Sequence, residues 1–299
     1  MKLVNLLNDN TSNLGVQTDH GIIDLKLALT MHPSDHHVNS EMMPLIRGGQ
    51  EALGNLESYI ATLPTNAESA FLLQVNSVTW APCVPDPQKL ICVGLNYRKH
   101  AEETNSPIPK YPILFNKFNN SLTGHHAEVV IPNVTKKLDY EAELAIIIGK
   151  KAKNVKVEEA LSCVFGYTIA NDLSARDLQT LTPQWMLGKS CDGFAPLGPS
   201  LVTADEVENP NQLDIQTLVN GELRQNSNTK DMIFHCDEII SFISRHMTLE
   251  PGDVILTGTP EGVVFGLPEH EQVYLQAGDE VTVRINKLGS LTNRFVAEG

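Results

Sequence analysis

The chain has 299 residues, of which 41% are hydrophobic and 19% charged, and its formal net charge at pH 7 is −14. A chain of this size can bury one large core or two smaller ones. The acidic balance argues against nucleic acid as a partner, because phosphate binding needs clustered positive charge. No apolar run approaches the ~20 residues that span a bilayer, so we expect no membrane association.

The start of the chain and the cysteines bear on cellular location. Residues 1–5 lack the basic start and long apolar segment of a secretory signal peptide. The five cysteines are odd in number, scattered, and form no C-x-x-C pair. Such a pattern is typical of reduced thiols, so the sequence predicts a cytoplasmic protein.

Residues 1–85 are expected to form a small N-terminal α/β domain. Short apolar runs at 3–7, 14–17 and 22–25 predict strands, and apolar residues at helical spacing predict a helix near 50–62. His32, His36 and His37 could bind a metal, but Pro33 argues against a helix, and we expect a solvated loop. Three prolines at 82–87 form a stiff connection, so we place a domain boundary there, with a larger domain at 86–299.

The larger domain opens with an apolar strand at 89–93, and the following residues can begin a short helix. His100 and Glu103 would share one face of that helix because they are three residues apart. A carboxylate that orients a histidine makes a general-base pair. The alternative is a surface pair on a solvated helix.

Residues 138–149 are expected to form a strand with apolar residues on both faces, which indicates burial on both sides. Glu141 and Glu143 point the same way, because side chains alternate along a strand. Two buried carboxylates side by side either take up a proton or need a cation, and a divalent metal with oxygen ligands is one solution. A half-exposed edge strand with two solvated glutamates is the other interpretation.

Asp172 follows a predicted strand at 164–170 and is either a turn residue or a third metal ligand. Ser174 and Asp177 are spaced as a capping box, which predicts a helix that presents Arg176 and Gln179 on one face. Lys189 stands in a Gly- and Pro-rich loop with few other charges.

The remaining elements are mostly strands. Asn220-Gly221 predicts a hairpin turn, Asp237 is expected to cap a helix, and a strand at 254–257 leads into a tight loop at 258–262. Further strands are expected near 279–286 and 290–296. This pattern of many short strands and few helices predicts an α+β, β-rich roll or sandwich with peripheral short helices, not a doubly wound sheet.

Together these residues provide three carboxylates for a hard cation, a histidine base with an orienting acid, and a lysine for anion stabilisation. That set is suited to metal-assisted enolate chemistry. In chain order, the region from about 89 to 296 resembles the catalytic domain of the fumarylacetoacetate hydrolase family. The motifs that carry the resemblance are Val93-Gly94-Leu95-Asn96-Tyr97 with His100 and Glu103, Asp139-Tyr140-Glu141-Ala142-Glu143-Leu144, Gly166-Tyr167, Asn171-Asp172-Leu173-Ser174-Ala175-Arg176-Asp177, Gly188-Lys189-Ser190, Val219-Asn220-Gly221 and Gly258-Thr259-Pro260-Glu261-Gly262.

The resemblance implies the family's mixed β-sandwich roll, usually as a homodimer. It implies Mg²⁺ or Mn²⁺ held by Glu141, Glu143 and Asp172, a general-base dyad of His100 and Glu103, and charge stabilisation by Lys189. It further implies that Arg176 and Gln179 contact a small 2-oxo or 2,4-dioxo acid substrate, and that Thr259 lines the pocket.

One position departs from the pattern. The eponymous hydrolases carry an Asp ligand seven residues before the histidine, where this chain has Val93. The chain therefore resembles the branch with smaller substrates, namely acylpyruvases, oxaloacetate decarboxylases and hydroxymuconate-type isomerases. The leading hypothesis is a metal-dependent hydrolase that cleaves the C–C bond of 2,4-dioxo acids. Decarboxylation of oxaloacetate, isomerisation or tautomerisation, and a non-catalytic domain with a structural metal are the alternatives.

Overall fold

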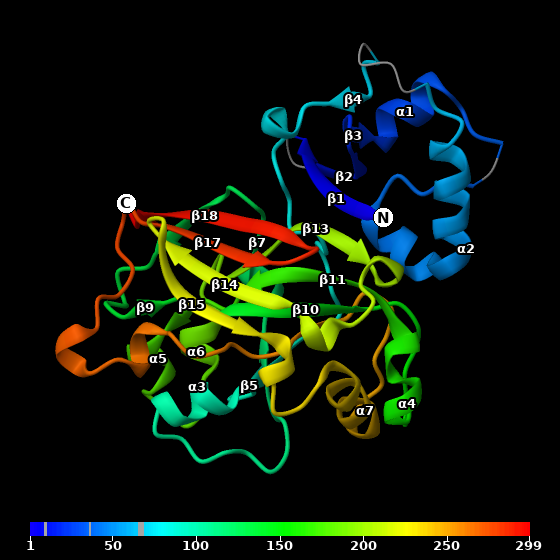
Figure 1. Cartoon of the computed structure of the whole chain (residues 1–299). Coiled ribbons are helices and arrows are strands. Elements are labelled where there is room, and N and C mark those ends of the chain that lie inside the picture. Colours follow the sequence, from blue (N-terminus) through cyan, green and yellow to red (C-terminus); the bar gives the residue numbers. More distant parts are fainter. Residues whose placement is uncertain (9–10, 36, 65–68) are drawn as a thin grey trace.

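The computed structural model describes residues 1–8, 11–35, 37–64 and 69–299, and Figure 1 shows their arrangement. Most strands belong to two sheets of mixed pairing. The larger, eleven-stranded sheet has the order β4 (Leu72–Leu73), β3 (Gly21–Asp24), β2 (Thr11–Thr18), β1 (Lys2–Asn8), β13 (Ala195–Thr203), β11 (Val164–Asn171), β10 (Ala142–Ile148), β16 (Val254–Leu256), β5 (Leu90–Gly94) and β6 (Ile113–Lys117), with β7 (Leu122–Thr123) paired to β13.

A second sheet of five strands packs against this one. Its order is β15 (Glu222–Asn228), β14 (Asp214–Val219), β17 (Glu280–Ile285), β18 (Gly289–Ala297) and β8 (Glu128–Ile131), and β12 (Ser174–Ala175) pairs separately with β9 (Leu138–Asp139). The helices lie around the sheets (Figure 1); they are α1 (Leu25–Met31), α2 (Met42–Ile60), α3 (Arg98–Glu103), α4 (Val157–Ala160), α5 (Arg176–Gln179), α6 (Met186–Lys189) and α7 (Cys236–His246).

Strand β10 lies at the centre of the molecule and is buried along its whole length. Leu144, Ile146 and Ile148 belong to the core that also contains residues of the five-stranded sheet and α7. Ala145 and Ile147 point to the opposite face and share a core with α1 and α2. The predicted burial of this strand on both sides is confirmed, and so is the β-rich fold class with peripheral helices.

The N-terminal strands continue the larger sheet. Strand β1 pairs antiparallel with β13, so that Leu3 lies opposite Leu201. The backbone N–H of Ala81 donates to the carbonyl of Asn5, which also ties the proline-rich connection to β1. The sheet thus crosses the proposed boundary near residue 85, and the division into two domains stays a prediction.

Several elements differ locally from the prediction. The expected strand at 138–149 is interrupted, because Tyr140 and Glu141 separate β9 from β10. The helix expected at 50–62 begins earlier, at Met42, and has a kink at Gly49. Helix α7 begins at Cys236 with His235 as its N-cap, so the predicted capping by Asp237 is wrong.

The predicted capping box of Ser174 and Asp177 is also wrong. Helix α5 has Ala175 as its N-cap and no side-chain capping bond. Ser174 is paired with Asp139 of β9, and its hydroxyl donates to the carbonyl of Asp172 at 2.8 Å. The predicted Asn220-Gly221 hairpin is confirmed: both residues have positive φ, 52° and 81°, between β14 and β15.

All five cysteines are free thiols. Within the described ranges, no helix combines the length and apolar character needed to cross a bilayer.

Gly166 in β11 tests how closely the central strands pack. A Cβ at this position would lie 2.2 Å from the carbonyl oxygen of Val202 on β13, a backbone atom that cannot move aside alone. We expect Gly166→Ala to lower the free energy of unfolding by ~1–3 kcal/mol, as overpacking does. Gly54→Ala is the matched control, because nothing lies within 4 Å of its added Cβ on the exposed side of α2. Thermal unfolding should show destabilisation by the first and a small stabilisation by the second; equal midpoints would contradict this packing.

Candidate active site

Three carboxylates meet at the ends of two neighbouring strands. Glu141 directly precedes β10 and Asp172 directly follows β11. The two strands are antiparallel with Ala142 opposite Asn171, and the N–H of Asp172 donates to the carbonyl of Glu141 at 2.9 Å. One oxygen each of Glu141, Glu143 and Asp172 lie within 4.8 Å of one another. The structure therefore brings together the three residues predicted as metal ligands, and all three are buried.

Two buried lysines face this cluster. Lys189 at the end of α6 places Nζ 2.7 Å from Glu141 Oε2 and 2.9 Å from Asp172 Oδ2. Lys117 at the end of β6 places Nζ 2.6 Å from Asp172 Oδ1. Burial alone would lower the pKa of Lys189, but Asp172 and Glu141 outweigh it and raise that pKa above its usual value. The Lys189 side chain therefore stays an ammonium at neutral pH.

The two glutamates differ in electrostatic environment. Burial would raise the pKa of Glu141, but Lys189 and Arg176 outweigh it and lower the pKa to about 2. Burial, Asp172 and Glu141 instead raise the pKa of Glu143 well above its usual range. Glu143 accepts a hydrogen bond from the backbone N–H of Gly258 at 2.6 Å. No Lys or Arg of the described chain lies within ion-pair distance of Glu143.

The donor set fits a divalent cation. Four buried carboxylates, including Asp139, face three cationic side chains here. One of these carboxylates, Glu143, thus has no cationic partner among the described residues of this buried site. Clustered carboxylate oxygens are ligands that hard divalent cations such as Mg²⁺ prefer. Glu141, Glu143 and Asp172 are the residues that would hold the ion.

The predicted histidine dyad is present on α3. His100 Nδ1 lies 2.8 Å from Glu103 Oε1, and the backbone N–H of Gly262 donates to Glu103 Oε2 at 2.9 Å. A carboxylate only accepts hydrogen bonds, so this contact assigns the proton of a neutral ring to Nδ1 and leaves Nε2 as the basic nitrogen. His100 is buried, so the alternative of a surface pair on a solvated helix does not apply to it.

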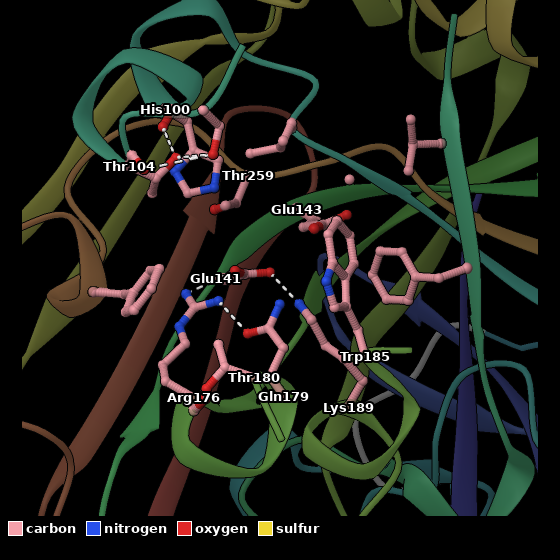
Figure 2. A pocket seen from close by; sticks show the side chains of 16 residues that line it. His100, Thr104, Glu141, Glu143, Arg176, Gln179, Thr180, Trp185, Lys189 and Thr259 are labelled. Carbon is pink, nitrogen blue, oxygen red and sulfur yellow. Dashed lines mark hydrogen bonds and ion pairs between the residues drawn. The ribbon is translucent and has the colours of Figure 1, made fainter. Parts of the chain in front are cut away.

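A cavity of about 200 Å³ lies between these groups. It is lined by seven of the nine predicted site residues: His100, Glu141, Glu143, Arg176, Gln179, Lys189 and Thr259. Figure 2 shows His100 and Thr259 across the cavity from Arg176 and Gln179, with Glu141 between them. The other two do not line the cavity but bond to residues that do: Glu103 to His100, and Asp172 to Lys189.

The predicted substrate contacts also lie together. Arg176 donates from one terminal nitrogen to Gln179 Oε1 at 3.0 Å, as their spacing on α5 predicts. Thr259 accepts a hydrogen bond from Gln225 Nε2 at 2.8 Å, which holds its hydroxyl in the cavity wall. The described residues His32 and His37 are exposed, and His36 lies outside the described residues.

Several lining residues were not predicted. Phe115, Trp185 and Phe265 form apolar walls. A Cβ on Gly94 would lie 2.5 Å from the indole of Trp185, so a larger residue there would displace the indole from this wall. Lys117 was also missed, because a single lysine that ends an apolar strand looks like an ordinary surface residue in the sequence.

These observations define a class: a β-rich enzyme fold with a buried carboxylate cluster and a histidine–glutamate pair at one cavity. The family model described as fumarylacetoacetate (FAA) hydrolase C-terminal matches residues 89–296, and the chain belongs to this family.

Three known proteins illustrate the range of activities among similar chains. An oxaloacetate tautomerase of Xenopus laevis, named as mitochondrial, is 42% identical over 285 residues, which cover 95% of this chain and 85% of the relative. A solved maleylpyruvate hydrolase from Sphingobium sp. SYK-6, in complex with manganese(II) and pyruvate, has a TM-score of 0.80 and 31% identity, with both chains fully covered. A 5-carboxymethyl-2-hydroxymuconate delta-isomerase from Mycobacterium smegmatis has a TM-score of 0.73 and 31% identity, again over both whole chains. The predicted similarity to the branch with smaller substrates is confirmed.

The predicted cytoplasmic location is wrong by the same comparison. The similar tautomerases of Xenopus laevis, Rattus norvegicus and Bos taurus are all named as mitochondrial. The physical reason is that reduced cysteines and a soluble composition describe the folded body of a protein. They carry no information on the compartment in which that body works.

Proposed function

We propose that the chain is a metal-dependent tautomerase of oxaloacetate or a closely similar small 2-oxo acid. The observation that carries the proposal is the His100–Glu103 pair at 2.8 Å beside the buried carboxylate cluster. The tautomerase relative supports this choice of reaction, because it is similar over nearly the whole chain.

The residues of the site have distinct roles in this proposal. Nε2 of His100 removes a proton from C3 of the keto form, and the charged ring then delivers a proton to the enolate oxygen; the reverse steps convert the enol to the keto form. Glu103 orients the ring and stabilises its charged form. Lys189 offers ammonium donors to the negative charge that develops on the substrate oxygen. Arg176 and Gln179 bind and orient the acid, and the apolar walls exclude water. A divalent cation bound by Glu141, Glu143 and Asp172, Mg²⁺ or Mn²⁺, would supply Lewis acidity toward the 2-oxo group.

A direct assay tests the reaction. The enol form of oxaloacetate absorbs in the ultraviolet, so its conversion to the keto form can be followed optically. We expect the protein loaded with Mg²⁺ or Mn²⁺ to accelerate this conversion above the rate with metal alone, and to lose that acceleration in EDTA. A protein that binds the metal but leaves the conversion rate unchanged would contradict the proposal.

Hydrolysis of 2,4-dioxo acids is the second candidate. The same dyad can deprotonate a water in place of a carbon acid, and the maleylpyruvate hydrolase has the same fold. Acylpyruvates offered beside oxaloacetate separate the two reactions. Pyruvate release from acylpyruvates with no effect on enol conversion would favour the hydrolase, and CO₂ release from oxaloacetate would favour a decarboxylase.

A homodimer and the division into a small N-terminal domain and a catalytic domain at 86–299 remain part of the proposal. Light scattering at several protein concentrations tests the first.

A further inference from the structure

Asp139 is a buried carboxylate beside the site that takes no part in the cavity wall. Its Oδ1 accepts from the backbone N–H groups of Tyr140 and Val264, at 2.9 and 3.0 Å. Its Oδ2 accepts from the N–H of Phe265 at 3.0 Å and from Nε of Arg176 at 2.9 Å. Each oxygen thus has two donors, and the carboxylate is fixed from four directions.

Arg176 connects this anchor to the carboxylate cluster. Its Nε donates to Asp139, and Nη2 lies 2.7 Å from Glu141 Oε1 in an ion pair whose geometry is not that of a well-aligned hydrogen bond. The guanidinium is planar and rigid, so a group that fixes one of its edges also sets the direction of the other. The Arg176 side chain is 4% exposed, and the ring of Phe265 lies 5.4 Å from its central carbon, so few other orientations are open to it.

We propose that Asp139 is a positioning residue, which acts through Arg176 to hold Glu141 in the orientation that binds the metal. This inference rests on the proposed role of Glu141 as a ligand. Asp139 itself does not line the cavity, and its side chain bonds to Arg176 and backbone N–H groups, not to Glu141, Glu143 or Asp172. Nothing in the sequence pattern assigned it a role. Residues that orient a metal ligand in this way commonly change metal affinity ~10–100-fold when they are lost.

The chemistry of the anchor suggests Asp139→Asn as the test. An amide has only one acceptor oxygen, and its NH₂ group is a donor. In either orientation the NH₂ group faces two donors, those of Tyr140 and Val264 or those of Phe265 and Arg176, so two hydrogen bonds are lost. We expect this variant to bind Mn²⁺ about tenfold more weakly than wild type, measured by isothermal titration calorimetry without substrate. Omitting the substrate separates this result from the reaction that the enzyme catalyses.

A double-mutant cycle with Arg176→Lys tells positioning from simple charge. Lysine keeps the charge but has no planar fork to span Asp139 and Glu141. If Asp139 acts through Arg176, Asp139→Asn should have little further effect on Mn²⁺ affinity in the Arg176→Lys protein. A direct electrostatic effect of Asp139 on the ion would persist in the Arg176→Lys protein. If the fold-losses of Mn²⁺ affinity of the two single variants multiply in the double variant, the two residues act independently and the proposal is overturned.

Asp253→Asn is the matched control for loss of a buried aspartate. Asp253 accepts from the backbone N–H groups of Lys89 and Glu250 and pairs with the Lys89 ammonium at 2.7 Å, away from the cavity. We expect it to lower thermal stability but to leave Mn²⁺ affinity unchanged. If Asp139→Asn does not fold, Asp139→Glu carries the same test, because it keeps the charge and displaces the carboxylate.

Unchanged Mn²⁺ affinity in a folded Asp139 variant would overturn this inference and leave the proposed function intact. Wild-type protein that binds no Mn²⁺ would overturn both.

Discussion

Replacing His100 with alanine is expected to reduce the turnover of the 2-oxo acid by ~10²–10⁴-fold, the usual contribution of a positioned general base. His100 is the only histidine among the described residues that line the cavity, so no neighbouring imidazole can take over its proton transfer. Metal affinity should not change, because His100 is bonded to Glu103 and not to the carboxylate cluster. Glu103 keeps its bond from the Gly262 N–H, so the loop that it holds should stay in place.

Steady-state kinetics and Mn²⁺ titration on the same preparation check this expectation. His125→Ala is the matched control: His125 is a half-buried histidine whose Nδ1 accepts from the N–H of Thr292, and it does not line the cavity. Its loss should leave kcat unchanged. Wild-type turnover in a His100→Ala protein would remove the dyad from the mechanism, and loss of metal binding in that protein would contradict the separation of base and metal site.

Local patterns in the sequence predict those parts of the site that depend on local geometry. The alternation of side chains expected over residues 138–149 puts Glu141, directly before β10, and Glu143, within β10, in one cluster, and the i,i+3 spacing on α5 brings Arg176 to Gln179. These relations are set by backbone periodicity, so they can be read from spacing alone. Assigning roles to the same residues needed the resemblance to a family.

Contacts between distant segments could not be predicted in this way. Asp139 is held by the N–H groups of Val264 and Phe265, which follow it by more than a hundred residues in the chain. Lys117 finds Asp172 only because β6 and the end of β11 come together in the fold. The failed capping box has the same origin, since pairing of Ser174 with β9 overrides its local preference for a helix cap.

Replacing Glu143 with glutamine is expected to change stability in opposite directions with and without metal. In the metal-free protein, burial, Asp172 and Glu141 raise the pKa of Glu143, so its ionised form costs folding free energy. Because the pKa is raised in the folded state, this cost grows as the pH rises from the ordinary pKa of a glutamate toward the raised pKa and is constant above it, and a neutral glutamine avoids it. We therefore expect metal-free Glu143→Gln to be at least as stable as wild type, with an advantage that increases with pH between the ordinary pKa of a glutamate and the raised pKa of Glu143.

With metal the order should reverse. Wild-type protein at a Mn²⁺ concentration ~100 times its Kd gains about 2.7 kcal/mol of stability, and a variant that has lost a ligand should gain little of this. Thermal unfolding in EDTA and in Mn²⁺, at two pH values, measures both effects.

Glu141→Gln is the informative comparison for this experiment. Glu141 is paired with Lys189 and Arg176 at 2.7 Å each, so its replacement removes one of the two carboxylate partners of each buried cation and leaves Lys189 with Asp172 and Arg176 with Asp139. Glu141→Gln should be less stable than wild type in EDTA and should also lose the stabilisation by Mn²⁺. Glu143→Gln should lose only the stabilisation by Mn²⁺. Equal stabilisation of Glu143→Gln and wild type by Mn²⁺ would exclude Glu143 as a ligand, because the charge that makes it costly in the metal-free fold is the charge that the ion would use.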